Sequence, residues 1–239
     1  MKVINYLLGY KDLKIVQDND MFNFSLDSVL LPNFVTINKK IDRILDIGCG
    51  NAPIPLILST KTNARITGVE IQKEVYDLAI ESIKINKKDN QITIINKDIN
   101  DYYKEIETDS FDVITCNPPF FKYIETSNIN KNDYKTIARH EVKLNLNQLF
   151  SIAKKLLKNN GVIAIVHRPE RFVEVVEEMK KNSIEPKKVQ FVYPKKNMNA
   201  NIMLIEGSKN GKPGLKILPP IYTHLENGEY TEEIKKYFE

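Results

Sequence analysis

The segment NPPF (117–120) places two hydrogen-bond acceptors and an aromatic ring directly after the apolar run FDVITC (111–116). Prolines have no backbone N–H and force the preceding residue into extended conformations, so a strand must end here in a stiff turn. The Asn117 side-chain oxygen and the Pro118 carbonyl could accept both hydrogens of an exocyclic amine and turn its lone pair toward an electrophile. The Phe120 ring could stack on a planar group, or it could simply pack into a core.

Three acidic residues lie at the ends of other apolar runs, and together they suggest a ligand. Asp46 could take an ammonium group, and Glu70, 24 residues later, could accept from ribose hydroxyls. Asp98 could accept from an adenine amino group, with Ile99 packing on the ring. Each acid alone could be a solvated loop residue. Because open α/β sheets bind ligands at the carboxyl ends of their strands, the three together predict binding of S-adenosylmethionine.

A glycine-containing turn, GCGNAP (48–53), follows Asp46. Gly48 and Gly50 permit a tight turn and a close approach of backbone to ligand, although glycines often simply end strands. A dinucleotide fingerprint needs a third glycine and free N–H groups at the helix start. Ala52 and Pro53 stand there instead, so the turn suits a ligand with a cationic centre better than a diphosphate.

The elements that must position these residues alternate along the chain. Short runs rich in Ile and Val predict buried parallel strands, and helical patterns lie between most of them. The predicted strands are RILDIG (43–48), RITGVE (65–70), ITIINKD (92–98), FDVIT (111–115), GVIAIVHR (161–168), KKVQFVYP (187–194) and ANIMLIEGSK (200–209). Only five residues separate the last two, which must therefore be antiparallel neighbours. We predict an α/β fold with a mostly parallel, doubly wound, seven-stranded sheet that ends in an antiparallel hairpin.

We expect a single domain over residues 1–239. Residues 1–40 should form an N-terminal helical cap, 41–207 the core and 208–239 a basic C-terminal extension. Hydrophobic residues make up 42% and charged residues 28% of the chain, as in globular proteins. No run is long enough to cross a membrane and no secretory signal is evident, so we expect a cytoplasmic protein. Two cysteines make no metal site by themselves, and Cys116 is interpreted as strand packing.

The turn NPPF, with Pro119 completing the proline pair, resembles the motif of the S-adenosylmethionine-dependent amino-methyltransferases, which have a Rossmann-like class I methyltransferase fold. That class modifies amines of adenine, cytosine and guanine in nucleic acids and glutamine amides in proteins. Three further segments, FNFSLDSVLL (22–31), ARHE (138–141) and GKPGLKILPPIYTH (211–224), resemble the bacterial tRNA (adenine-37-N6)-methyltransferases that act on valine tRNA. The resemblance covers almost the whole chain and implies methylation of N6 of adenine 37 in the anticodon loop.

Basic residues near these motifs are candidates for contacts with a tRNA anticodon arm. The chain has only five arginines among 35 basic residues, namely Arg43, Arg65, Arg139, Arg168 and Arg171. Arg139 and His140 are placed to border the target pocket, unless Arg139 only braces its loop through an ion pair. Lys195 and Lys196, between the last two strands, could meet RNA phosphates or could be merely solvated. The net charge of +4 permits an anionic partner without requiring one.

Three alternatives remain open. A glutamine-amide protein methyltransferase shares the turn, but about 40 residues before the first strand are too few for the helical domain many of those enzymes carry. Another nucleic-acid amino-methyltransferase, acting on rRNA or DNA, would use the same residues. A catalytically silent RNA-binding protein on this fold is the third, although intact acids and an intact NPPF turn argue against it.

Overall fold

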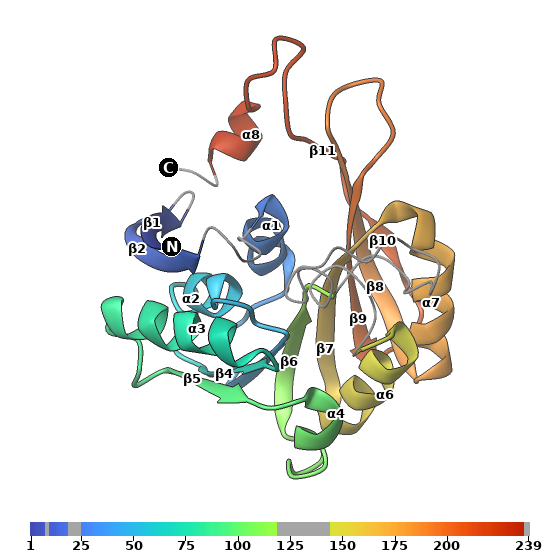
Figure 1. Cartoon of the computed structure of the whole chain (residues 1–239). Helices are drawn as coiled ribbons and strands as arrows, with labels where there is room; N and C mark the ends of the chain where they lie inside the picture. Colours follow the sequence, from blue (N-terminus) through green and yellow to red (C-terminus); the bar gives the residue numbers. More distant parts are fainter. Residues whose placement is uncertain (8–9, 19–24, 119–143, 237–239) are drawn as a thin grey trace, which may run out of the picture.

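The computed structural model describes residues 1–7, 10–18, 25–118 and 144–236 (Figure 1). Four of the predicted site residues lie outside these ranges: Pro119, Phe120, Arg139 and His140. Among the described residues the main sheet has nine strands, in the spatial order β10-β8-β9-β7-β6-β3-β4-β5, with β11 also paired to β8. These strands are β3 (Arg43–Ile47), β4 (Arg65–Glu70), β5 (Ile92–Asn96), β6 (Phe111–Cys116), β7 (Leu157–His167), β8 (Ile184–Tyr193), β9 (Ile202–Lys209), β10 (Lys216–Ile217) and β11 (Ile221–Tyr222).

The seven predicted strands are all present, and the predicted fold class is confirmed. Strands β3 to β7 pair in parallel, whereas β9 runs antiparallel to both β7 and β8. The terminal hairpin therefore inserts β9 between β7 and β8. Strands β10 and β11 come from the C-terminal extension and add two short parallel pairings to the outer edge of β8. Chain order reverses where β3 meets β6, which is the point at which doubly wound sheets bind ligands.

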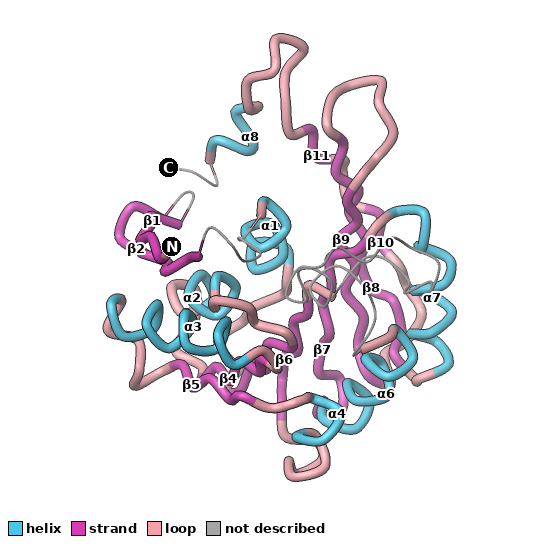
Figure 2. The backbone as a smooth tube through the Cα atoms, in the orientation of Figure 1, coloured by secondary structure: helices cyan, strands magenta, loops and turns pink. Residues whose placement is uncertain are grey.

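Helices cover both faces of this sheet (Figure 2). They are α1 (Leu26–Phe34), α2 (Pro53–Leu58), α3 (Lys73–Ile85), α4 (Ile99–Tyr102), α6 (Leu146–Leu156), the 3-10 turn η1 (Pro169–Arg171), α7 (Phe172–Lys181) and α8 (Glu232–Lys235). Alternate residues of one strand enter different cores: Ile44 packs in the cluster with α1, α2 and α3, and Leu45 in the cluster with α6 and α7. This burial on both faces explains why the strand sequences are continuously apolar.

The predicted all-helical cap over residues 1–40 is wrong for its first half. β1 (Lys2–Leu7) and β2 (Tyr10–Asp18) form an antiparallel hairpin, and only α1 is helical. Buried Leu13 and Ile15 are separated by exposed Lys14, an alternation of period two that favours a strand. The Val16 N–H donates to Ser82 Oγ on α3 at 2.9 Å, so the hairpin docks on a core helix.

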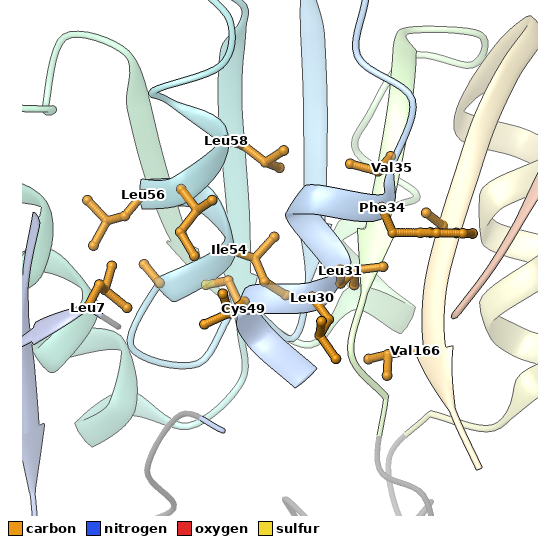
Figure 3. Close-up of a cluster of buried hydrophobic side chains, with 14 of the residues drawn as sticks. Leu7, Leu30, Leu31, Phe34, Val35, Cys49, Ile54, Leu56, Leu58 and Val166 are labelled. Carbon is orange, nitrogen blue, oxygen red and sulfur yellow. The ribbon is translucent and has the colours of Figure 1, made fainter. Parts of the chain in front are cut away.

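Helix α1 lies between α2 and the sheet, and its Leu30 and Leu31 side chains point toward the glycine turn and β7 (Figure 3). Its C-terminal end is held by Glu206 of β9, which is 3% exposed. The Glu206 carboxylate accepts from the Thr36 backbone N–H at 2.7 Å and from the Thr36 hydroxyl at 2.8 Å. Lys188 Nζ lies 3.4 Å from the same carboxylate and donates to the Phe34 carbonyl at 2.6 Å. This cluster fixes the C-terminal end of α1 against β8 and β9.

None of the described helices is long and apolar enough to span a membrane.

Candidate cofactor site and catalytic turn

The sheet brings four predicted site segments to one edge. Parallel pairing places Asp46 of β3 opposite Thr115 of β6, and Ile47 opposite Cys116. The residues that follow, Gly48 and Asn117, are therefore neighbours at the carboxyl ends of β3 and β6. Glu70 ends β4 on the other side of β3, and Asp98 follows β5.

Asp46 is fully buried, and one of its carboxylate oxygens has no donor in the described part of the chain. Its Oδ1 accepts from the Thr115 hydroxyl at 2.6 Å, whereas its Oδ2 is buried with no hydrogen-bond partner among the described residues. Burial raises the pKa of Asp46 to about 7, although the Thr115 hydrogen bond opposes that shift. A buried carboxylate oxygen without a donor is costly unless a ligand supplies one. The Asp46 site therefore fits an ammonium or another donor on a ligand.

The turn after β3 is built from left-handed conformations. Gly48 and Gly50 have φ values of 68° and 56°, and Ala52 has 72°. The Gly48 and Cys49 N–H groups both donate to the Val69 carbonyl of β4, at 2.9 and 3.0 Å. Among the described residues, a Cβ atom added at Gly48 or Gly50 would meet nothing within 4 Å, so this part of the chain leaves space above the backbone there. The turn offers a ligand both close approach and room.

Glu70 couples this turn to the second strand. Its carboxylate accepts from the Gly50 N–H at 3.0 Å and from the Gln72 N–H at 2.8 Å. Burial raises the pKa of Glu70, and these two backbone hydrogen bonds oppose the shift. Each oxygen has a further lone pair, so the same carboxylate can hold the turn and accept from ribose hydroxyls.

Asp98 lies two residues beyond the end of β5, rather than in the strand as predicted. It is the N-cap of α4, and its Oδ1 accepts from the Asn100 N–H at 2.8 Å and from the Asn100 side-chain amide at 3.0 Å. Ile99, the next residue, is 7% exposed and packs in the core with α6. Capping accounts for one oxygen of Asp98, and the other oxygen is the one that a ligand amine would meet.

Asn117 and Pro118 follow β6 as predicted, and Pro118 is buried whereas Asn117 is half-buried. Within the described part of the chain, the Asn117 side-chain amide has no hydrogen-bond partner. Burial raises the pKa of both cysteine thiols, Cys49 and Cys116, well above their usual range. Neither sulfur is thus a thiolate nucleophile at neutral pH.

The two predicted RNA-contacting lysines lie at the carboxyl ends of the parallel strands, whereas another lysine, in the C-terminal block, lies at the opposite end of the sheet. Lys195 and Lys196 follow β8 at the carboxyl edge, where the Lys195 ammonium donates to the Glu226 carbonyl at 3.1 Å and Lys196 is exposed. Lys209, in the C-terminal block, ends antiparallel β9 at the opposite edge and pairs with Asp109. The extension 208–239 contains five lysines and five glutamates, so its predicted basic character is wrong for the segment as a whole.

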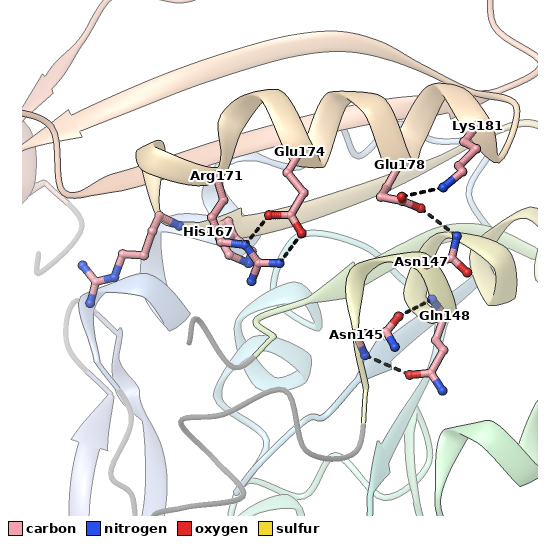
Figure 4. A network of polar contacts seen from close by, with 9 residues as sticks. Asn145, Asn147, Gln148, His167, Arg171, Glu174, Glu178 and Lys181 are labelled. Atoms are coloured by element: carbon pink, nitrogen blue, oxygen red, sulfur yellow. Dashed lines mark hydrogen bonds and ion pairs between the residues drawn. The ribbon is translucent and has the colours of Figure 1, made fainter. Parts of the chain in front are cut away.

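A polar cluster after β7 was not predicted, although the scarcity of arginine in the chain pointed toward it. Arg171 pairs with Glu174 through two hydrogen bonds, of 2.8 and 2.9 Å, beside buried His167 (Figure 4). His167 Nδ1 accepts from the Arg168 N–H at 2.8 Å, and burial, with a contribution from Arg171, lowers the pKa of His167 to about 4. This imidazole is therefore neutral. Because its Nδ1 accepts a hydrogen bond, the single N–H of the ring is on Nε2.

A second missed residue is Thr115, which orients Asp46. No pattern marks it, because a threonine in a β-branched strand looks like ordinary strand composition. Only the parallel register of β3 and β6 brings its hydroxyl to the carboxylate.

The two carboxylates and the glycine turn described above fit S-adenosylmethionine. A buried carboxylate with one oxygen lacking a donor suits the ligand's ammonium group, a second carboxylate suits its ribose, and the open glycine turn admits the chain between them. Those residues would hold the cofactor, which supplies an electrophilic methyl group.

Comparisons with known proteins identify the family of the chain. The family model described as "Methyltransferase small domain" matches residues 25–189. The tRNA1(Val) (adenine(37)-N6)-methyltransferase of Flavobacterium psychrophilum is 26% identical over 221 residues, which cover 85% of this chain and 93% of that protein. The protein of the same name from Dyadobacter fermentans is 31% identical over 169 residues, covering 69% of this chain and 68% of the relative.

Solved structures show the same fold at low identity. A predicted O-methyltransferase from Agrobacterium tumefaciens superposes with a TM-score of 0.69 at 17% identity, covering 88% of this chain and 94% of that one. Geranyl diphosphate C-methyltransferase from Streptomyces coelicolor, solved with S-adenosyl-L-homocysteine, gives 0.59 at 12% identity, covering 77% of each chain. The family match spans the glycine turn, all three acids and the NPPF turn, and the chain therefore belongs to the methyltransferase small domain family of S-adenosylmethionine-dependent methyltransferases.

Proposed function

We propose that this methyltransferase transfers a methyl group to the exocyclic N6 amine of adenine in tRNA, at adenine 37 of the valine tRNA anticodon loop. The observation that carries the proposal is the position of Asn117 and Pro118. They follow β6 at the switch point of the sheet, next to the turn that begins at Gly48. The names of the relatives support the choice of tRNA as substrate.

We propose that the residues at this end of the sheet act by positioning the adenine amine. The amine of adenine is conjugated to the ring, so its lone pair is a weak nucleophile. In the proposed complex the Asn117 side-chain oxygen and the Pro118 carbonyl accept the two amine hydrogens, which turns the lone pair toward the methyl group. Because Pro118 is a proline and another proline follows it, its backbone is restricted to extended conformations, which holds the direction of the Pro118 carbonyl. This is preorganisation, and no side chain has to act as a base of unusual pKa.

The remaining substrate contacts are proposals on residues outside the described ranges. Pro119 completes the rigid turn, Phe120 stacks on the flipped adenine, and Arg139 and His140 border the target pocket. Stacking of one base on an aromatic ring contributes about 1–3 kcal/mol to binding of single-stranded nucleic acid.

The test replaces Asn117 with Ala and, as a matched control, with Asp, which keeps an acceptor oxygen. Asn117→Ala should lower kcat by about 100-fold or more, by analogy with the loss of one oxyanion-hole donor, and should leave cofactor affinity unchanged. Asn117→Asp should retain more activity than Asn117→Ala. The assay follows transfer of a labelled methyl group to unmodified valine tRNA, and calorimetry measures cofactor binding.

Substrate identity is tested separately with tRNA in which adenine 37 is replaced by guanine. That tRNA should bind and accept no methyl group, because phosphate contacts supply most of the affinity. Methylation of the altered tRNA would refute the assignment of the target base. Methylation of a glutamine amide in a protein, with none in tRNA, would refute the substrate class.

A further inference from the structure

Two loops beyond the sheet edge form one structure that the proposed function has not used. The first, residues 194–201, joins β8 to β9, and the second, residues 223–231, joins β11 to α8; both project from the top of the molecule in Figure 1. The Thr223 N–H donates to the Tyr193 carbonyl and the His224 N–H to the Pro194 carbonyl, each at 2.9 Å. Because backbone hydrogen bonds join the loops, they present a fixed surface.

Four aromatic side chains stand on these loops or at the strand ends that lead into them, in two pairs. Tyr193 and Tyr222 lie with ring centroids 5.5 Å apart, and His224 stacks on Tyr230 at 4.7 Å with an interplanar angle of 28°. We call these four residues the aromatic arch. His224 and Tyr230 face each other across an antiparallel bridge, and Tyr230 is 39% exposed. A stacked pair with an exposed ring can extend its stack by one more planar group.

The hydrogen bonds around His224 define which of its nitrogens can accept. The Thr223 hydroxyl lies 3.0 Å from the Pro194 carbonyl, to which it donates, and 2.7 Å from His224 Nδ1. A hydroxyl has one hydrogen, so Thr223 must accept from Nδ1–H. The neutral ring then has Nε2 as an acceptor, suited to an amine or to a ribose hydroxyl of RNA.

The charge on the two loops is balanced, so the surface does not depend on attraction of phosphate. Lys195 and Lys196 are opposed by Glu226 and Glu229. Large apolar side chains are exposed beside them, with Met198 at 52% and Leu225 at 44% exposure. Exposed rings and apolar groups with little net charge favour stacking on bases over contacts with the sugar–phosphate backbone.

The aromatic arch stands at the carboxyl edge of the sheet, the same edge as Asn117. Arg168, which follows β7, donates from its guanidinium to the Asn201 carbonyl at 2.8 Å and so links the first loop to the strand next to β6. The arch and Asn117 thus lie at the same end of the sheet, on strands separated by β7 and β9.

We propose that the aromatic arch binds unpaired bases of the RNA substrate by stacking, with the exposed part of the Tyr230 ring in the contact. This inference rests on the proposed action on tRNA. It adds a recognition surface that reads the single-stranded loop around the target base and takes no part in methyl transfer.

The chain contains no tryptophan, which makes a direct probe possible. Tyr230→Trp introduces a single tryptophan, whose emission should be quenched when an anticodon stem-loop RNA is added and a base stacks on it. Tyr6→Trp, at a ring that is 60% exposed on the N-terminal hairpin, is the matched control and should not be quenched. A fully paired duplex of the stem should quench neither.

Affinity and turnover give the second measurement. Tyr230→Ala should weaken binding of the stem-loop about 5- to 150-fold, leave the salt dependence unchanged, and raise KM for tRNA without lowering kcat. Tyr230→Phe, which keeps the ring, should bind as wild type does.

The inference would be overturned if the RNA does not quench Tyr230→Trp and binds Tyr230→Ala as tightly as wild type. The aromatic arch would then be a surface for a partner of another kind, such as a protein. The proposed function is judged separately, by methylation of tRNA by the wild-type protein. If the stem-loop quenches Tyr230→Trp and no tRNA is methylated, the proposed function fails while base stacking on the arch stands.

Discussion

Replacing Asp46 with Asn should make the cofactor-free protein more stable and at the same time unable to bind its cofactor. Burial raises the pKa of Asp46 from 3.8 to about 7, so the folded protein binds this proton more tightly than the unfolded chain does. Stability is therefore lost as the pH rises from about 4 to 7. At about 1.4 kcal/mol per pKa unit, the penalty above pH 7 is about 4 kcal/mol, of which about 2–3 kcal/mol develops between pH 5 and pH 8.

The Asn variant has no such titration, although its buried amide hydrogens gain no acceptor and cost about 1–3 kcal/mol at every pH. At pH 8 the variant should be more stable than wild type by about 1–3 kcal/mol, which is a rise in Tm of several degrees for a chain of this length. At pH 5 that advantage should disappear or reverse. With the cofactor at about 100 times its Kd, wild type should gain about 2.7 kcal/mol and the variant almost nothing.

Thermal unfolding of both proteins at pH 5 and pH 8, with and without S-adenosylmethionine, measures all of these quantities. Asp89→Asn, the same chemical change on an exposed turn, is the control for the substitution itself and should leave the Tm close to that of wild type. A Tm difference between Asp46→Asn and wild type that is equal at the two pH values would refute the assignment of a buried carboxylate that ionises within the native state. Equal cofactor stabilisation of the two proteins would refute its role as a ligand.

Three more outcomes are expected. Glu70→Gln should keep the fold and lower cofactor affinity about 10- to 150-fold in calorimetry. The uncharged amide has a single acceptor oxygen, which cannot serve the Gly50 N–H, the Gln72 N–H and the ribose together. Cofactor affinity equal to that of wild type would contradict the ribose assignment. Glu206→Ala should lower the free energy of unfolding in urea by about 1.5–3 kcal/mol, because Thr36 loses its hydrogen bonds to a charged acceptor and Lys188 loses its ion pair. Glu105→Ala, in an exposed pair, should cost less than about 1 kcal/mol. The pKa of His167 in the folded protein, about 4, lies below its ordinary value of 6.5, so stability should fall as pH drops from 6.5 to 4. In His167→Gln the urea midpoint should depend less on pH over this range. An unchanged dependence of the midpoint on pH would count against a buried neutral imidazole.

Local sequence was sufficient for the seven core strands and for the placement of Asp46 and Glu70, although not for the N-terminal hairpin or for Asp98. Continuous Ile and Val runs indicated strands buried on both faces, and the five-residue gap before Ala200 allowed only an antiparallel hairpin. Asp46 and Glu70 could be assigned to the ligand edge because all parallel strands present their carboxyl ends on one side. Such inferences depend on periodicity and chain direction, which are properties of short segments.

The hydrogen-bond partners depended on contacts between distant segments. Thr115 holds Asp46 from 69 residues away, and Glu206 reaches Thr36 across 170 residues. The insertion of β9 between β7 and β8, and the docking of the N-terminal hairpin on α3, are likewise choices among pairings that each strand could make locally. The pKa of Asp46 follows from the same cause. The pKa of this carboxyl is raised because strands and helices from several parts of the chain exclude water around it. No pattern of neighbouring residues in the sequence encodes that exclusion.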